Sequence, residues 1–311
     1  VEDDGVAVDV AGERIYVLDE LGPRLLAFTL EGALIGEVGR QGEGPGEFEM
    51  PVAVDVDSLG VVWVVDASRS LLLSWDRQAR FLDQERLSVP YWGPGFKASQ
   101  GAFLYVRGDE DRQGFTETLI QTTDGAYSEL IRQGQEWVAV SSSCGTMPLP
   151  RVLAPSVIWN ANARYTVSVT WPEYTLRVLE GDSLVASLKR GIPPIRITEK
   201  EAESMVGAGP LSFLTESCGM TEAEVVRAAG FVEAASPIDR LAVDPLDRVW
   251  TRSNALMGGP NLIEILSVER GYLGSLRAPV FPVAFLSGER FLAIADHEWG
   301  SSVEIWSIQR E

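Results

Sequence analysis

The sequence predicts an all-β protein, a single six-bladed β-propeller over residues 1–311 that carries a short two-helix insertion after the fourth blade. Three observations lead to this prediction. Short alternating apolar segments run along the chain, glycine and proline are frequent between them, and one two-strand pattern recurs at a period typical of propeller blades. The 30 glycines and 17 prolines suit a fold with many tight turns.

The recurring pattern is clearest near the N-terminus. Val-Ala-Val-Asp-Val stands at residues 6–10 and again at residues 52–56, 46 residues later. Each copy is followed by a turn and by a second apolar strand that ends in aspartate. Leu-Ala-Val-Asp-Pro at residues 241–245, followed by a second strand with Trp250, repeats the pattern far downstream. We expect Trp63 and Trp250, both in second strands, to pack in the core.

The period divides the chain into six units, expected over residues 5–39, 51–87, 95–132, 155–190, 237–277 and 280–310. The inner strands of the third and fourth units have only a weak apolar pattern in the sequence. Residues 192–232 do not fit the period. Within them Thr198 and Thr221 each precede a glutamate by three residues, which is the capping-box pattern of a helix start. We therefore expect two short helices there, standing on the face with the longer loops.

The last unit supplies only three strands before the chain ends. An open sheet edge exposes unpaired backbone groups. We expect its outer strand to come from residues upstream of Val1 or from a partner, since residues 1–4 are too short for a strand. A chain that begins with valine is itself expected to be processed or trimmed.

Several segments resemble known families. Gly-Glu-Gly-Pro-Gly-Glu-Phe at residues 42–48 resembles the linker between blades of NHL-repeat propellers. Other segments resemble a bacterial group of six-bladed propellers, at residues 164–165, 190–194, 197–201, 239–244, 249–250 and 303–308. The resemblance covers nearly the whole chain and implies the propeller fold. It implies little about function, because propellers host unrelated activities.

The net charge is −19, from 45 acidic and 26 basic residues. Such a charge repels phosphate backbones and anionic lipid surfaces. We therefore expect no nucleic-acid partner, and the absence of a long apolar run predicts no direct bilayer insertion by this chain. A protein partner, basic or membrane-embedded, suits the charge, as does a bound cation. The alternative is that the acidity only keeps the protein in solution.

The loops between second and third strands, and between blades, are the longer ones and should share one face. Function concentrates on long loops held by a rigid scaffold. The residues of the expected binding face are Asp66, Trp92, Asp109, Glu110, Asp111, Trp137, Trp171, Asn254, Asp296, His297 and Trp299. The tryptophans among them are suited to anchor a protein or carbohydrate partner, or else they roof the channel.

The carboxylates of this face would suit Ca²⁺, which takes six to eight oxygen ligands. The alternative is that aspartates begin turns by bonding nearby backbone groups. A single histidine excludes a multi-histidine metal centre, and two cysteines exclude a four-cysteine zinc site. No Gly-x-Ser-x-Gly or Ser-x-x-Lys motif is present. We assign no catalytic residue and no resident cofactor, with Ca²⁺ as the one open candidate.

The favoured function is a non-enzymatic extracytoplasmic binding or scaffold protein, for example an extrinsic accessory subunit of a membrane-bound complex. The alternative is a Ca²⁺-dependent propeller hydrolase or lyase acting in the central channel. Bound metal in the purified protein would discriminate between the two.

Cys144 and Cys218 form a disulfide or remain two buried thiols. Both lie in connections between blades, on the same face and one blade apart, so their sulfurs can meet. We predict the disulfide, which would tie the insertion to residues 141–148 and roof that side of the channel. Such a bond persists in an oxidising compartment, which places the protein in the periplasm or outside the cell.

Overall fold

The computed structural model describes residues 3–19, 22–91, 93, 95–99, 102–110, 114–207, 209–254, 256, 261–298 and 300–308. Within these residues, six sheets of three to five strands, antiparallel except for the pair β4–β5, follow one another along the chain, and a two-stranded sheet lies between the fourth and fifth. Each of the six predicted units forms one of these sheets, so the predicted propeller is confirmed.

The first three sheets are built as follows. Blade 1 contains β1 (Val6–Asp9), β2 (Arg14–Asp19), β3 (Arg24–Thr29), β4 (Leu34–Gln41) and the parallel β5 (Glu47–Phe48). Blade 2 contains β6 (Pro51–Val56), β7 (Val62–Asp66), β8 (Leu71–Trp75) and β9 (Phe81–Arg86). Blade 3 contains β10 (Phe96–Ser99), β11 (Ala102–Glu110), β12 (Gly114–Thr123), β13 (Ala126–Ser142) and β14 (Gly145–Pro150). A short 3-10 helix, η1 (Asp3–Gly5), precedes β1.

The remaining three sheets have fewer strands. Blade 4 contains β15 (Trp159–Ala161), β16 (Thr166–Val169), β17 (Thr175–Glu180) and β18 (Ser183–Lys189). Blade 5 contains β21 (Ile238–Val243), β22 (Arg248–Ser253), β23 (Leu262–Ser267) and β24 (Gly271–Arg277). Blade 6 contains β25 (Pro282–Phe285), β26 (Arg290–His297) and β27 (Gly300–Ser307). In the described part of the chain this last blade has three strands, as predicted.

Aspartate side chains build the turns between first and second strands. Asp244 accepts hydrogen bonds from the backbone N–H groups two and four residues later, at 2.9 and 3.0 Å, and from the Trp250 indole at 2.9 Å. Asp57 accepts the same three bonds, with Trp63 as the indole donor at 3.2 Å. These two aspartates, which are not among those of the expected binding face, form their turns by bonding nearby backbone groups. The packing of Trp250, which is fully buried, is as predicted.

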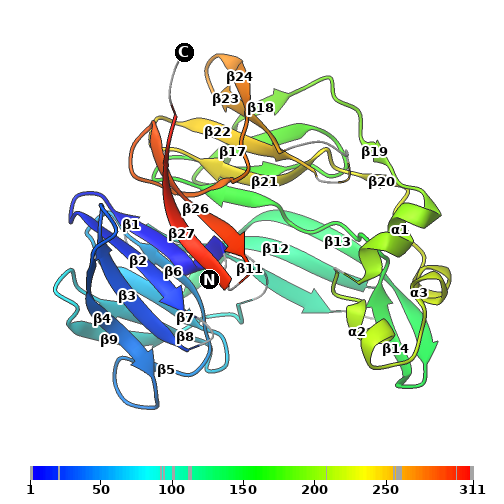
Figure 1. Ribbon diagram of the computed structural model, residues 1–311, viewed down its shortest axis with the longest axis horizontal. Helices are drawn as coiled ribbons and strands as arrows, with labels where there is room; N and C mark the ends of the chain where they lie inside the picture. The colour runs from blue at the N-terminus through cyan, green and yellow to red at the C-terminus, as the bar shows by residue number, and fades with distance from the viewer. Residues whose placement is uncertain are drawn as a thin grey trace.

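Apolar side chains fill each boundary between neighbouring blades. At the first boundary, Leu18 of β2 packs with Val62 and Leu73 of blade 2. The ring closes in the same way, because Val6 of β1 and Leu292 of β26 lie in one buried cluster. Figure 1 shows blade 1 (blue) beside the last strands, β26 and β27 (red). Burial of apolar surface between sheets therefore holds the two ends of the ring together.

Blade 3 extends beyond its predicted end at residue 132. β13 pairs with β12 as far as Glu136 and then, from Trp137 to Ser142, with β14. The expectation that residues 141–148 form a loop into the fourth blade was wrong. They form a hairpin that projects from the outer strand of blade 3, with Cys144 at its tip.

Among the described residues, the insertion contains three helices, and the expectation of two was wrong. They are α1 (Glu199–Val206), α2 (Ser212–Glu216) and α3 (Glu222–Ala229), and the short strands β19 (Ile195–Arg196) and β20 (Ala234–Ala235) pair at its base. Both predicted capping boxes are present, at Thr198 and Thr221. α2 begins without any side-chain cap. It forms where fully buried Leu214 packs into the apolar cluster of the insertion.

The insertion and the hairpin share one buried core. Val140 of β13 lies in the same cluster as Val206, Leu214 and Val226 of the three helices. We call residues 137–150 together with 195–235 the helical module. Figure 1 shows its helices gathered at one edge of the molecule, beside β13 and β14. No helix among the described residues has the length and apolar character needed to span a bilayer.

Candidate functional site

Two cavities lie along the propeller axis, where the inner strands meet. The larger, of about 520 Å³, opens at the end where β1 and β21 begin, and we call it the channel mouth. The smaller, of about 350 Å³, lies toward the opposite end. The cavities share the lining residues Val6, Lys97, Asn160 and Val283. Cavities of this size suit small organic ligands.

The walls of the channel mouth are mostly apolar and aromatic. They include Phe96, Trp159, Leu241 and Phe281, all of which are buried. Gly95 lets the chain pass close to the Trp159 indole, because a Cβ at this position would lie 2.7 Å from the ring and its φ is +98°.

Charged side chains in the channel mouth come from the N-terminal turn and from two blades. Arg240 of β21 forms an ion pair with Asp3 of η1 at 2.5 Å. The neighbouring Asp239 forms an ion pair with Arg252 of β22 at 2.8 Å. A β-bulge between Ile238 and Arg240 interrupts the register of β21, which re-aims successive side chains. One short segment of blade 5 thereby presents a carboxylate and a guanidinium to the same cavity.

The N-terminal turn is tied across the mouth at a second point. Asp4 accepts a hydrogen bond from the Gly95 N–H at 2.7 Å, at the entry to blade 3. Both Asp3 and Asp4 line the cavity. η1 therefore connects blade 1 with blades 3 and 5 through its two carboxylates.

A further carboxylate lies deeper in the channel. Burial raises the pKa of Asp55 above its usual value, although Lys97 and the Ala98 N–H act in the opposite direction. The Nζ of Lys97 lies 3.5 Å from Asp55 Oδ1, and the Ala98 N–H donates to Oδ2 at 2.8 Å. Lys97 lines both cavities, so its ammonium group lies near the point where they meet.

Of the residues on the expected binding face, the structure brings two to the channel mouth. Trp171 and Asn254 line it. Asn254 donates to the carbonyl of Ser236 at 3.0 Å and accepts from the Leu256 N–H at 3.0 Å. Trp171 also packs against the core of the helical module. The module core therefore adjoins the mouth, and Ala235 of β20 lines it. None of the described residues of α1, α2 and α3 does, so the expectation that the insertion roofs the channel was wrong.

The other described residues of that face are distributed over separate blades. Asp109 and Glu110 are exposed at the end of β11, and Asp109 pairs with Arg107 at 2.6 Å. Trp137 lies in the strand β13 instead of a loop and stacks on Phe115 with ring centroids 5.4 Å apart. Trp92, Asp111 and Trp299 lie outside the described residues.

Asp296 and His297 are exposed on the hairpin of blade 6. Asp296 accepts from the Ser301 hydroxyl at 2.8 Å. The Nε2 of His297 lies 2.9 Å from the Ser302 hydroxyl and 3.7 Å from Glu304. Within the described part of the chain, no three His, Cys, Asp or Glu side chains are grouped so that they could hold a metal ion. The carboxylates that we considered for Ca²⁺ are therefore not brought together there.

Asp66 is fully buried, and its carboxylate accepts hydrogen bonds from nearby backbone groups. Burial acts to raise its pKa, but the Glu49 N–H at 2.8 Å, the Arg69 guanidinium at 2.7 Å and the Ser68 hydroxyl at 2.9 Å lower that pKa below its usual value. These bonds join the end of β7 to the connection between blades 1 and 2. Asp66 therefore has a structural role in this fold.

We expect Asp66→Asn to lower the free energy of unfolding by about 2 kcal/mol near pH 7, because the Arg69 guanidinium and three backbone N–H groups lose a charged acceptor. A carboxyl whose folded pKa lies below its unfolded value of about 3.9 stabilises the fold above that value, and the stabilisation is lost as pH falls through the folded pKa. Urea unfolding near pH 7 and near pH 3 should show the difference shrinking in acid. The exposed Asp296→Asn is the control. A difference that is undiminished in acid would contradict this assignment.

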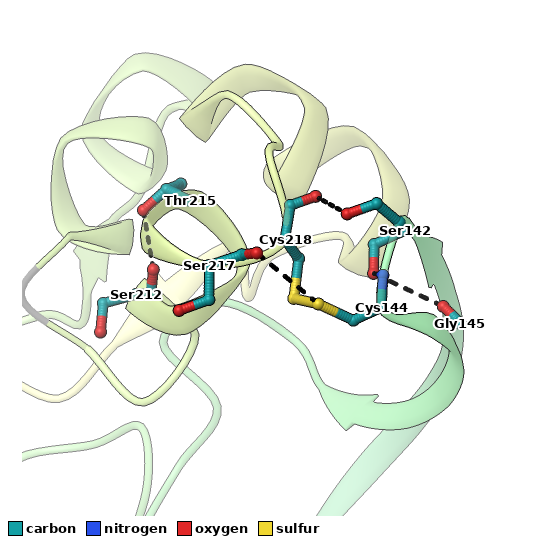
Figure 2. The surroundings of a disulfide bond; sticks show 8 residues. Ser142, Cys144, Gly145, Ser212, Thr215, Ser217 and Cys218 are labelled. Carbon is teal, nitrogen blue, oxygen red and sulfur yellow. Dashed lines mark hydrogen bonds between the residues drawn. A yellow bond between two sulfur atoms is a disulfide. The ribbon is translucent and has the colours of Figure 1, made fainter.

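The predicted disulfide is present. Cys144 and Cys218 are joined, 74 residues apart in sequence, with Cα atoms 5.4 Å apart. Figure 2 shows the bond linking the hairpin tip to the segment after α2. The Ser143 hydroxyl also donates to the Cys218 carbonyl at 2.7 Å. The bond lies inside the helical module and fastens its two parts together.

Arg240, Asp3 and Lys97 were missed by reasoning from the sequence, which looked for function only in the longer loops. Arg240 directly precedes the Leu-Ala-Val-Asp segment that marks the inner strand of blade 5. The first residues of inner strands face the channel mouth, so the repeat itself held a signal for this site.

Residues 6–130 match the model of a family described as a 6-bladed beta-propeller. The six sheets continue the same pattern through the rest of the chain. The chain is a six-bladed β-propeller. No curated protein matches the propeller in sequence.

Solved structures with the same architecture have low identity to this propeller. A putative exported protein from Bacteroides fragilis is similar with a TM-score of 0.52 and 11% identity, over 95% of this chain and 82% of the other. A member of the DUF4221 family from Bacteroides vulgatus has a TM-score of 0.52 and 8% identity, over 95% and 90%. A gluconolactonase from Xanthomonas campestris has a TM-score of 0.46 and 11% identity, over 93% and 82%. At these identities, the two structures with a TM-score of 0.52 show a shared fold alone.

Proposed function

We propose that this propeller is a non-enzymatic extracytoplasmic scaffold whose helical module docks a basic protein partner. The observation that supports the proposal is the second core, outside the blades, that the helices share with the hairpin of blade 3. The cores between blades 1 and 2 and between blades 6 and 1 are separate clusters that contain no module residue. A part with its own core and its own cross-link is suited to present a surface to a partner.

The charge of the helices favours a basic partner. From Glu199 to Ala229 the chain has six glutamates against Lys200 and Arg227. Two of the glutamates are used in the capping boxes, and Glu216 is among the exposed ones. An acidic surface steers a basic partner toward it and excludes acidic ones.

The disulfide supports a location in an oxidising compartment, since such bonds are rare in the cytosol. The exported neighbour of the same fold is compatible with this location. We place the protein in the periplasm or outside the cell, as an extrinsic subunit on a membrane-bound complex. The alternative, a Ca²⁺-dependent hydrolase or lyase, receives no support from the described residues, among which no metal-binding group of three side chains occurs.

Site-specific photo-crosslinking in native membranes tests the docking. A photoreactive residue in place of exposed Glu216 in α2 should capture a basic protein, and the same residue in place of exposed Glu269, in the turn after β23, should not. Charge reversal by E199K/E203K should weaken the capture and leave the fold intact. Equal capture at both positions, or capture that is indifferent to the reversal, would refute the proposal.

A further inference from the structure

The blades alone make the channel mouth positive. Its lining charges from the blades are Lys97, Asp239 and Arg240. Asp239 is neutralised by Arg252 at 2.8 Å. The remaining carboxylates that line the cavity, Asp3 and Asp4, both belong to η1. Lys97 is paired with Asp55, whose carboxylate lies 3.5 Å away, so Arg240 is the lining cation whose carboxylate partner comes from outside the blades.

The contact between Arg240 and Asp3 is a replaceable one. The Asp3 carboxylate lies 2.5 Å from the guanidinium, but the two side chains remain 38% and 44% exposed. Ion pairs with this much solvent contact stabilise a fold only weakly. Asp3 comes from a three-residue turn, whereas Arg240 is held in a strand paired on both sides of its bulge. A carboxylate from outside can take the place of Asp3 without disturbing a blade.

The walls of the cavity beside Arg240 favour an apolar group in the ligand that carries this carboxylate. Phe96, Trp159, Leu241 and Phe281 line the same cavity of about 520 Å³. An apolar group enters such a wall favourably because its surface is removed from water. Arginine recognises carboxylates with paired N–H donors.

We propose that the channel mouth binds an amphipathic monocarboxylate, whose carboxylate replaces that of Asp3 on Arg240 and whose apolar part lies against the aromatic wall. Asp3 then acts as an internal competitor that keeps the site closed when ligand is scarce. The site is separate from the helical surface that we propose for docking, and it does not depend on that docking.

Isothermal titration of the full chain with decanoate, below its micelle concentration, tests the site. Decyltrimethylammonium and decyl glucoside are the cationic and neutral probes of equal chain length. Asp3→Asn should tighten decanoate binding about two- to sixfold, the range expected when a weak internal ion pair no longer competes. Arg240→Gln should weaken it about tenfold or more, as a charged hydrogen-bond donor is lost.

The matched control is Arg290→Gln, an exposed arginine at the start of β26, the second strand of blade 6, on the side away from the channel mouth, which should leave binding unchanged. In the Arg240→Gln background, Asp3→Asn should have no further effect. Asp3→Asn leaves the blades untouched, so it remains informative if Arg240→Gln does not fold. Three results would overturn the proposal: no tightening with Asp3→Asn, equal binding of the cationic probe, or a loss at Arg290→Gln as large as at Arg240→Gln.

Discussion

Replacing both cysteines, in C144A/C218A, is expected to lower the free energy of unfolding by about 4 kcal/mol on the chain-entropy estimate for a closed loop of 74 residues. The loop contains all of blade 4 together with α1 and α2. Without the bond, the unfolded chain gains freedom and the hairpin tip is no longer fastened to the segment after α2. Urea unfolding followed by circular dichroism and tryptophan fluorescence measures the loss.

The loss of stability in C144A/C218A should appear first in the helical module. Hydrogen exchange in the variant should accelerate in α1 and α3, while blades 1 and 2 keep their protection, because their boundary has a separate core. Reducing the native protein with dithiothreitol should reproduce the variant. Unchanged stability, or equal acceleration in all blades, would show that the bond does not hold the module.

The second large effect is expected for Asp244→Ala, at about 3–5 kcal/mol. Asp244 is fully buried and also binds the Arg248 guanidinium at 2.5 Å. Its removal leaves a partly buried cation, the buried Trp250 indole N–H and two backbone N–H groups without their acceptor. The turn that joins β21 to β22 would lose its anchor, and with it the inner strand that carries Arg240.

Asp57→Ala is the matched control for this experiment. Asp57 accepts the same two backbone N–H groups and the indole of Trp63, but no arginine. We expect a smaller loss, of about 1–3 kcal/mol, because only neutral donors are left unpaired. Thermal or urea unfolding of both variants gives the comparison. Equal losses at the two positions would show that the charge on Arg248 contributes little.

Features set by neighbouring residues were predictable from the sequence. The capping boxes at Thr198 and Thr221 depend on side chains three residues away, so both helix starts were predicted correctly. α2 has no such signal, since Leu211 precedes it without a side-chain cap. Its helical form depends on the burial of Leu214 among residues from other helices, and a local pattern does not report this.

The hairpin after residue 132 shows the same limit. Its strands are covered by the helices, which pack against Val140 and Leu149, so the hairpin depends on residues distant in sequence. The channel mouth was not predicted, although the repeat places Arg240 near the start of an inner strand. Closure of the ring brings Arg240 and Asp3 together, although they are far apart in the sequence.

The sequence by itself determined the number of blades, the two capped helices and the pairing of the cysteines. The first two follow from a period and a local spacing, and the pairing follows from the presence of only two cysteines, although the hairpin that carries Cys144 was not predicted. The tertiary structure decided that the insertion packs on blade 3 beside the channel, and that Asp3, Lys97 and Arg240 converge at its mouth. The physical reason is that inner strands from all six blades meet at one axis, so groups distant in sequence become neighbours only when the ring closes.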